Sequence, residues 1–376
     1  MMNLGRPIDV AVIGAGVLGL ATTDALARRG ADVVCFDGRP PGQGQSGGLT
    51  RTFRHRHDNE RVVRLAVEAR DGFRRWERRS GRRMIGPEGA VYAGMADSDV
   101  VGLVTNGVPH SFVPADRHRE YFGPLAEVDG PLLVDPGAGA IRARRVIDSL
   151  TDWVKDRIVQ ADVHAVTVPA GGRAVEFHTA DAIHQARHVI IVAGTATPRL
   201  AAGVGLDVPL SSALHARPHY RVRDAFAGSP LPCWVDRSGQ FGETVYGSPI
   251  GSTGRYVLGL IGDAVDVPLT PAGALPPGAS MAEHVQRVSA YVAQALPGLD
   301  PDPVGVRVCV MTKLPAGSDA FGAWHTPGVT ALTGHNLFKL APVLGELLAD
   351  TAVADRLPEQ LAQAASKSLS AAAGVR

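Results

Sequence analysis

The first forty residues alternate between apolar runs and glycine breaks. A short apolar run, Asp9 to Ile13, ends at the segment GAGVLG, and the residues from Leu20 to Arg29 that follow have helical character. Gly30 ends this predicted helix, and a second apolar run, Asp32 to Phe36, ends at Asp37. Short β-rich runs on both sides of a helical segment predict a strand, helix, strand unit.

Later parts of the chain return to this unit. An amphipathic helix is predicted by apolar residues at helical spacing, namely Val62, Leu65, Ala66, Ala69, Phe73 and Trp76. A second helix is predicted from about Ala143 to Arg157, followed by short strands at 163–168 and 174–179. The apolar run from His188 to Gly194 is typical of a buried parallel strand that ends in a glycine turn. Further strands are predicted at 304–311 and 329–332, and a terminal helix at 341–354.

Two other stretches lack this rhythm. Residues 84–136 are loop-rich and strand-like, and residues 206–303 alternate in short strands with Pro and Gly turns, plus one helix near 281–295. These stretches predict a separate antiparallel layer. The predicted first unit therefore comprises residues 1–83, 138–205 and 304–376, and the second comprises 84–137 and 206–303. The Ala-rich tail after Leu361 is expected to fray.

The composition is that of a soluble globular protein. The 376 residues include 45% hydrophobic and 20% charged residues, and the formal net charge is +1. These values exclude a disordered chain and give no electrostatic footprint for nucleic acid. The basic run from Arg74 to Arg83 is interrupted by Glu77 and is expected to be a solvated helix face. The apolar stretch from Ile8 to Ala27 contains Asp9 and Asp24, so no membrane span is expected there.

The three cysteines, Cys35, Cys233 and Cys309, are widely spaced and odd in number. This pattern suggests neither a disulfide framework nor a zinc site. A reducing, cytoplasmic location is therefore the expectation.

The glycine segment carries the first candidate chemistry. Gly14 permits the tight turn, Gly16 lets the backbone approach a pyrophosphate, and Gly19 lets helix and strand pack closely. Phosphates bind at such a helix N-terminus because of its free N–H groups and its dipole. Asp37 is placed to accept hydrogen bonds from ribose hydroxyls. The motif does not separate FAD from NAD, but the absence of continuing βαβ repeats favours FAD.

The predicted strand 304–311 has two different faces. Valines alternate along it with Arg307, Cys309 and Met311, so these three side chains point the other way. A guanidinium near a cysteine favours the nucleophilic thiolate, which can attack the 8α-methyl carbon of a flavin. From these residues alone, an inert core cysteine is the commoner alternative.

The chain resembles the monomeric sarcosine oxidase and N-methyltryptophan oxidase family of FAD-dependent amine oxidases, in the D-amino-acid oxidase superfamily. The resemblance runs nearly end to end through the segments GAGVLG, TRTFRHRHDNE, YGSP, VCVMTK and TGHNLFKLAPVLGELLAD. It implies an α/β fold, with a Rossmann-like FAD-binding domain built from discontinuous segments and an antiparallel-sheet (α+β) substrate domain. It also suggests a monomer.

The resemblance assigns roles to particular residues. It implies that Cys309 holds FAD covalently, that Arg54 and Lys339 bind the substrate carboxylate, and that Arg51 lies beside the flavin ring. Two fixed cations would orient an amino acid toward the flavin.

The segment from Gly334 to Lys339 precedes the terminal helix, whose N-terminus would stabilise negative charge on the reduced flavin. His335 could contact flavin or substrate, or make a structural hydrogen bond. Tyr246 matches a pocket tyrosine, although a core tyrosine would give the same pattern.

Three departures from the family pattern alter the expected chemistry. Val257 stands where the family has a lysine that promotes reaction with oxygen, and Arg255 or Lys313 could substitute for that cation. Ile261 and Met311 replace a pocket histidine and a pocket tyrosine. The substrate is therefore expected to be bulkier or more apolar than sarcosine.

These inferences predict oxidation of the C–N bond of a secondary or cyclic amino or imino acid that carries a carboxylate. A hydride would pass to flavin N5, and O2 would take the electrons to give H2O2. The first alternative is a dehydrogenase with a non-oxygen acceptor, motivated by Val257. A flavin monooxygenase, suggested by Gly262, Asp263 and Ala264, and a non-enzymatic flavin-binding protein are the others. No metal, nucleic-acid or membrane partner is expected.

Overall fold

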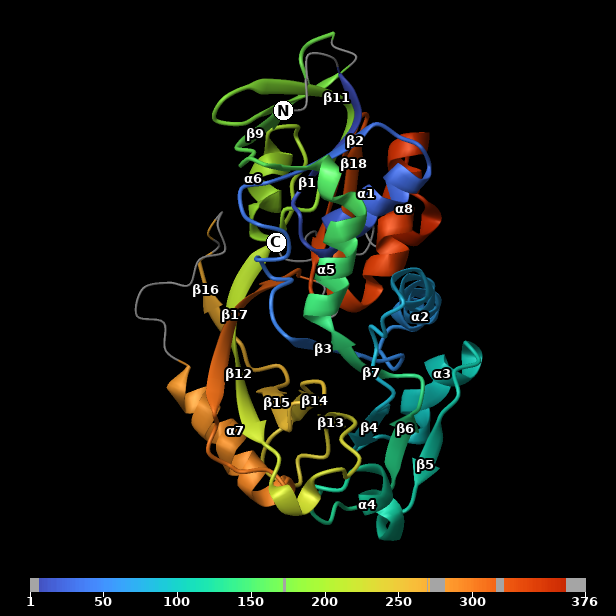
Figure 1. Cartoon of the computed structure of the whole chain (residues 1–376), viewed down its shortest axis with the longest axis vertical. Helices are drawn as coiled ribbons and strands as arrows, with labels where there is room; N and C mark the ends of the chain where they lie inside the picture. Colours follow the sequence, from blue (N-terminus) through green and yellow to red (C-terminus); the bar gives the residue numbers. More distant parts are fainter. Residues whose placement is uncertain (1–6, 172–173, 269, 271–280, 316–320, 363–376) are drawn as a thin grey trace, which may run out of the picture.

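The computed structural model describes residues 7–171, 174–268, 270, 281–315 and 321–362. Figure 1 shows two lobes, one above the other, each built around one large sheet. The predicted fraying of the tail after Leu361 concerns residues beyond the described range, except Ala362.

The upper lobe contains an eight-stranded sheet in the order β18-β19-β11-β1-β2-β8, with β10 and β9 added beside β11. Its strands are β1 (Ile8–Ile13), β2 (Val33–Asp37), β8 (Ile158–Gln160), β9 (Ala165–Thr167), β10 (Val175–His178), β11 (Ile183–Ile191), β18 (Phe321–Thr326) and β19 (Val329–Gly334). The five strands from β19 to β8 are parallel, whereas β18 is antiparallel to β19. Strands far apart in the chain thus form one sheet, as the return of the chain to its first unit predicts.

Helices pack against this sheet and one another to form the core of the upper lobe (Figure 1). The main ones are α1 (Val17–Arg28), α2 (Glu60–Ser80), α5 (Ala143–Val154) and α8 (Ala341–Ala354). The predicted apolar face of α2 is buried, and its basic residues 74, 75, 78 and 79 are exposed or partly exposed. The predicted mixed α/β fold class is confirmed.

The lower lobe contains a nine-stranded sheet in the order β16-β12-β15-β14-β13-β4-β6-β5, with β17 also paired to β12. Its strands are β4 (Ala90–Ala93), β5 (Ser111–Val113), β6 (Leu132–Asp135), β12 (Ser211–Arg221), β13 (Cys233–Asp236), β14 (Val245–Pro249), β15 (Arg255–Leu260), β16 (Val265–Val267) and β17 (Gly305–Lys313). The sheet is antiparallel apart from the parallel pair β13 and β4. Helix α7 (Ala282–Ala295) covers it through Val288, Tyr291 and Val292.

The remaining elements are small. Strands β3 (Thr50–Phe53) and β7 (Gly139–Arg142) form a two-stranded sheet between the lobes (Figure 1). The short helices are α3 (Val101–Thr105), α4 (His118–Tyr121) and α6 (Thr197–Ala202).

Strand β17 belongs to the sheet of the lower lobe, although the predicted boundary at residue 304 places it in the first unit. That boundary assigns β17 to the FAD-binding segments, but β17 pairs with β12 from Ser211 opposite Lys313 to His219 opposite Gly305. A strand with alternating valines could belong to the sheet of the upper lobe or to that of the lower lobe. The sequence pattern therefore did not show which sheet contains β17. The other segment boundaries stay a prediction.

The glycine turn brings β1 and α1 into direct backbone contact. A Cβ atom at Gly19 would lie 1.7 Å from the carbonyl oxygen of Gly14, and one at Gly14 would lie 2.6 Å from the carbonyl oxygen of Val192. Gly14 also has a φ of 109°, which disfavours other residues. The backbone geometry therefore requires both glycines.

We expect Gly19→Ala to lower the free energy of unfolding by about 2 kcal/mol or more, because the added methyl group meets backbone that cannot rotate away. Gly305→Ala is the matched control, since a Cβ there meets nothing within 4 Å. Urea unfolding of both variants measures the difference. Equal stability of the two would show that the contact is not a constraint.

Candidate functional site

The nucleotide end of the site lies where β1 and β2 finish. Helix α1 begins after Gly16 with no side-chain cap and no acidic residue in its first turn. The N–H of Val17 donates to Ser46 Oγ at 2.9 Å, and the N–H of Ala15 donates to Asp37 Oδ2 at 2.8 Å. Ser46 and Asp37 thus occupy two N–H groups of the turn, and the glycine turn and dipole at the start of α1 suit a pyrophosphate.

Arg51 is fixed where the glycine-rich loop enters β3. Its guanidinium donates to the carbonyl oxygens of Thr50 at 2.8 Å and of Gln45 at 3.0 Å, and also to Gly47. It lies 5.7 Å from the ring centre of Phe338. Burial, together with the nearby charge of Arg217, lowers the pKa of Arg51 to about 10. The side chain is therefore held in a position that disfavours its charge.

The pairing of β12 with β17 builds a polar face. His215 is opposite Cys309, and Arg217 is opposite Arg307. Residues directly opposite in an antiparallel pair point to the same side, so these four side chains share one face. On the other face Val308 and Val310 pack near α7, as the alternation of β17 predicts.

Three guanidinium groups gather at a cavity of about 450 Å³. Arg51, Arg217 and Arg307 line it, together with Leu49, Thr50, His219, Ile250, Val257, Val306 and Val308. The Nε atoms of Arg217 and Arg307 are buried without a hydrogen-bond partner, and within the described chain no carboxylate pairs with any of the three groups. The lining therefore favours an anionic ligand or developing negative charge.

Tyr246, in β14, contacts the same face. Its hydroxyl lies 2.6 Å from Nε2 of His215, and Arg217 lies 5.9 Å from its ring centre. Burial lowers the pKa of His215 to about 4, and the charges of Arg217 and His335 act in the same direction. Burial also raises the pKa of Tyr246, although Arg217 opposes this. A neutral imidazole therefore faces a neutral phenol at neutral pH.

The residues predicted to bind the carboxylate lie near this cavity. Lys339 is buried in a short 3₁₀ helix, η6 (Leu337–Leu340), that contacts β3. Arg54 directly follows β3, and its charge opposes the burial that raises the pKa of Tyr246. His335 lies close enough to act on His215, and the carbonyl of Gly334 accepts from Thr312 Oγ1 at 2.7 Å. Arg51, Arg54, Tyr246, Cys309 and the η6 segment thus belong to one region, whereas Asp37 and the three glycines lie at the nucleotide turn.

Arg217 and His215 were missed by the sequence interpretation. The available signal was the polar residue at every second position of the segment HARPH, which places His215, Arg217 and His219 on one strand face. The two residues that could substitute for the missing lysine do not line the cavity. Arg255 is exposed, and Lys313 forms an ion pair with Asp266.

The segment that suggested a flavin monooxygenase lies in the lower lobe. Asp263 of the GDA segment pairs with Arg287 of α7 in the lower lobe. It therefore lies away from the nucleotide turn that such a motif would serve.

Comparison with known proteins identifies the family. Residues 9–351 match the DAO family of FAD-dependent oxidoreductases, and the chain belongs to this family. The chain is 26% identical to human peroxisomal sarcosine oxidase in an alignment of 367 residues that covers 90% of each protein. The resemblance to sarcosine oxidase-like members of the superfamily is confirmed.

Two solved structures share the fold. One is NikD, described as an unusual amino acid oxidase essential for nikkomycin biosynthesis, with 23% identity, a TM-score of 0.81 and coverage of 96% of this chain and 97% of that one. The other is L-proline dehydrogenase from P. horikoshii, with 17% identity, a TM-score of 0.80 and coverage of 97% and 98%.

The residues present fit FAD. The glycine turn at the start of α1 suits its pyrophosphate, Asp37 suits its ribose, and the unpaired guanidinium nitrogens suit a flavin that becomes negative on reduction. In the portion of the chain that is described, no helix has the length and apolar character needed to cross a bilayer.

The low pKa of His215 makes folding stability depend on pH. Its ordinary pKa is 6.5 and its folded pKa is about 4, so below pH 6.5 the unfolded chain binds more protons than the folded chain. Acidification from pH 6.5 to 4 should therefore cost about 1 to 3 kcal/mol of stability through this residue. Urea unfolding of wild type and His215→Gln across this range measures the cost. The variant should show a flatter profile than the control His110→Gln, and identical profiles would contradict the assignment.

Proposed function

We propose that this protein oxidises the C–N bond of a secondary or cyclic amino or imino acid and passes the electrons to O2. The carboxylate-free group of Arg51, Arg217 and Arg307 is the observation that carries the proposal. Flavin oxidation of an amine delivers negative charge to the ring and then to oxygen, and fixed cations in a largely dry site stabilise such charge. The names of the human relative and of NikD agree with an amine or amino acid substrate.

Arg54 and Lys339 would bind the substrate carboxylate, as the family resemblance implies. Arg54 extends from the end of β3 and Lys339 from η6, and these two elements are in contact. Cations from two rigid elements fix both the position and the direction of a bound amino acid. When bound, FAD supplies the acceptor for the hydride that leaves the carbon next to nitrogen.

The lining near Tyr246 favours an apolar substrate side chain. Ile261 and Tyr246 are partly buried against one apolar cluster that includes Tyr92. Met311 lies on the same face of β17 as Cys309. Because neither Ile261 nor Met311 can replace the hydrogen bonds of a histidine or a tyrosine, a substrate bulkier or more apolar than sarcosine fits better.

Arg217 supports O2 as the acceptor. It lines the same cavity as Val257, which stands where the family has its lysine. His219 is opposite Val257 in the pairing of β12 with β15, and Arg217 lies two residues from His219 on the same strand face. A guanidinium on the neighbouring strand thus offers the positive charge that Val257 lacks.

We expect Arg217→Met to slow reoxidation of the reduced flavin by O2 roughly 100-fold, because one fixed donor to developing charge is lost. Stopped-flow absorbance measures this step after anaerobic reduction by sarcosine, proline, pipecolate or an N-methylated aromatic amino acid. Flavin reduction by the best of these substrates should change far less. The midpoint potential of the bound flavin should become more negative in the variant.

Arg255→Met is the control, because it removes an exposed arginine from the strand that carries Val257. It should leave reoxidation unchanged. If wild-type flavin is reduced by an amino acid but reoxidised rapidly only by a quinone or dye, the dehydrogenase alternative holds. If no amine reduces the flavin, the proposed function is wrong.

We also propose that Cys309 holds the flavin through a thioether. Burial raises the pKa of Cys35 to about 12 and that of Cys233 well above the ordinary range, so both thiols are inert. Cys309 is a free, partly exposed thiol opposite His215, and it lies near enough to Arg51 to oppose the lowering of that guanidinium's pKa. It is therefore the cysteine best placed to react.

Acid precipitation should leave yellow colour in the protein pellet of wild type and release it from Cys309→Ala. The thioether survives unfolding, whereas noncovalent FAD does not. Absorbance of the pellet and of the supernatant at the flavin band measures the distribution. Cys35→Ala is the control and should keep the colour in the pellet; release from wild type would exclude covalent attachment.

A further inference from the structure

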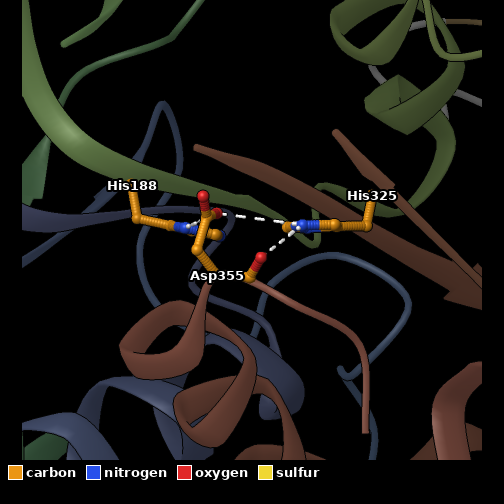
Figure 2. Close-up of side chains that lie close together, drawn as sticks. All are labelled: His188, His325 and Asp355. Atoms are coloured by element: carbon orange, nitrogen blue, oxygen red, sulfur yellow. Dashed lines mark hydrogen bonds and ion pairs between the residues drawn. The ribbon is translucent and has the colours of Figure 1, made fainter. Parts of the chain in front are cut away.

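Three side chains meet at the end of α8 that lies far from Lys339. His188 belongs to β11, His325 to β18, and Asp355 follows the last residue of α8. Figure 2 shows the two histidines extending toward Asp355 from opposite sides. Nδ1 of His188 lies 3.3 Å from Oδ1 of Asp355, and Nε2 of His325 lies 3.8 Å from the same oxygen. Their potential ligand atoms all lie within 4.8 Å of one another.

The other side of each ring contacts one buried hydroxyl. Thr330 Oγ1 lies 2.9 Å from Nε2 of His188 and 3.1 Å from Nδ1 of His325. Nε2 of His325 also lies 2.9 Å from the backbone oxygen of Asp355. The N–H of Gly328 donates to Oδ1 of Asp355 at 2.9 Å, which holds the carboxylate in place.

The hydrogen atoms of this cluster leave one ring nitrogen bare. Three hydrogen bonds join the two rings to Thr330 Oγ1 and to the Asp355 carbonyl. Two neutral imidazoles and one threonine supply one hydrogen for each of these bonds. Nδ1 of His188 then has no hydrogen, and its lone pair lies 3.3 Å from the carboxylate oxygen Oδ1 of Asp355. A cation between these two atoms would satisfy both.

We propose that one divalent cation of the zinc class binds to Nδ1 of His188, Nε2 of His325 and a carboxylate oxygen of Asp355. Imidazole nitrogen and carboxylate oxygen are zinc ligands at about 2.0–2.2 Å, and such atoms at tetrahedral corners lie about 3.4 Å apart. The recorded separations of 3.3 and 3.8 Å suit this arrangement. The Asp355 carbonyl or a water on its half-exposed side completes the coordination.

Thr330 fits as the outer partner of this cation. With both inner nitrogens on the metal, Nε2–H of His188 and Nδ1–H of His325 each donate to Thr330 Oγ1, which has two lone pairs. Metal-binding histidines usually donate their second N–H to such an acceptor, which fixes the ring orientation. All ring nitrogens are then satisfied.

A proton is the competing occupant, because a second hydrogen on His188 would also fill the space between Nδ1 and the Asp355 carboxylate. The experiment below distinguishes a proton from a metal ion.

The cation would stabilise the fold and take no part in catalysis. It would tie β11, the β18–β19 hairpin and the end of α8 together, and none of these three residues lines the cavity at Arg217. Binding to the folded chain alone raises stability by mass action.

The test uses tag-free, flavin-loaded protein freed of metal by a chelator and then incubated with ZnCl2 at pH 7.5. Plasma mass spectrometry after gel filtration should find about one zinc per chain, and cobalt(II) should give the visible spectrum of a tetrahedral site. Saturating zinc should raise the Tm by roughly 2–4 °C or more. Flavin content should not change.

Asp355→Asn is the main variant, because asparagine tolerates the left-handed φ of 49° and keeps an acceptor for the Gly328 N–H. Zinc affinity should fall roughly tenfold or more in this variant and in His325→Gln, while the control His110→Gln should match wild type. Equal zinc uptake by all four proteins would overturn the proposal. A wild-type protein that takes up no zinc would also overturn it. In that case, a Tm that rises on acidification in wild type but not in Asp355→Asn would show that a proton fills the site.

Discussion

The antiparallel pairing of β12 with β17 is the constraint on which the candidate site depends. It sets Arg217 opposite Arg307, and like charges directly opposite in a sheet are destabilising. Arg51 adds a third guanidinium, whose lowered pKa shows that burial and its neighbours disfavour its charge. Stability alone would be served better by a carboxylate or an apolar residue at one of these positions. The best explanation for these three arginines is therefore that the cavity binds a group that carries or develops negative charge.

The parts of the protein that were predicted from sequence are those whose signal is local. The turn at Gly14 and Gly19 and the acid at Asp37 occupy one short segment, so strand, helix and nucleotide turn could be inferred together. The terminal helix was predicted at its observed bounds, Ala341–Ala354, with Pro342 in its first turn. The polar face of β17 also followed from the period of the strand alone.

Register between distant strands was not accessible in this way. The face of Cys309 could be predicted, but its partner His215 lies far away in the sequence, and nothing local specifies that pairing. The same limit hid Arg217, which lines one cavity with Val257 and Arg51. For the same reason, the predicted boundary at residue 304 assigned β17 to the FAD-binding segments, although β17 pairs with β12. Likewise, His188, His325 and Asp355 are brought together only by the packing of α8 beside the sheet.

Helix α8 separates the cations near Lys339 from the cluster of His188, His325 and Asp355. Its first turn follows Lys339 and its last residue precedes Asp355, so its 14 residues place them about 21 Å apart along the helix axis. That exceeds the Debye length of about 8 Å at physiological salt, although a buried path is screened less. Close packing limits movement of the helix, since a Cβ at Gly345 would lie 2.9 Å from Ala21 of α1. A charge bound beside Asp355 would therefore change the stability of this lobe while leaving the cations around the cavity in place.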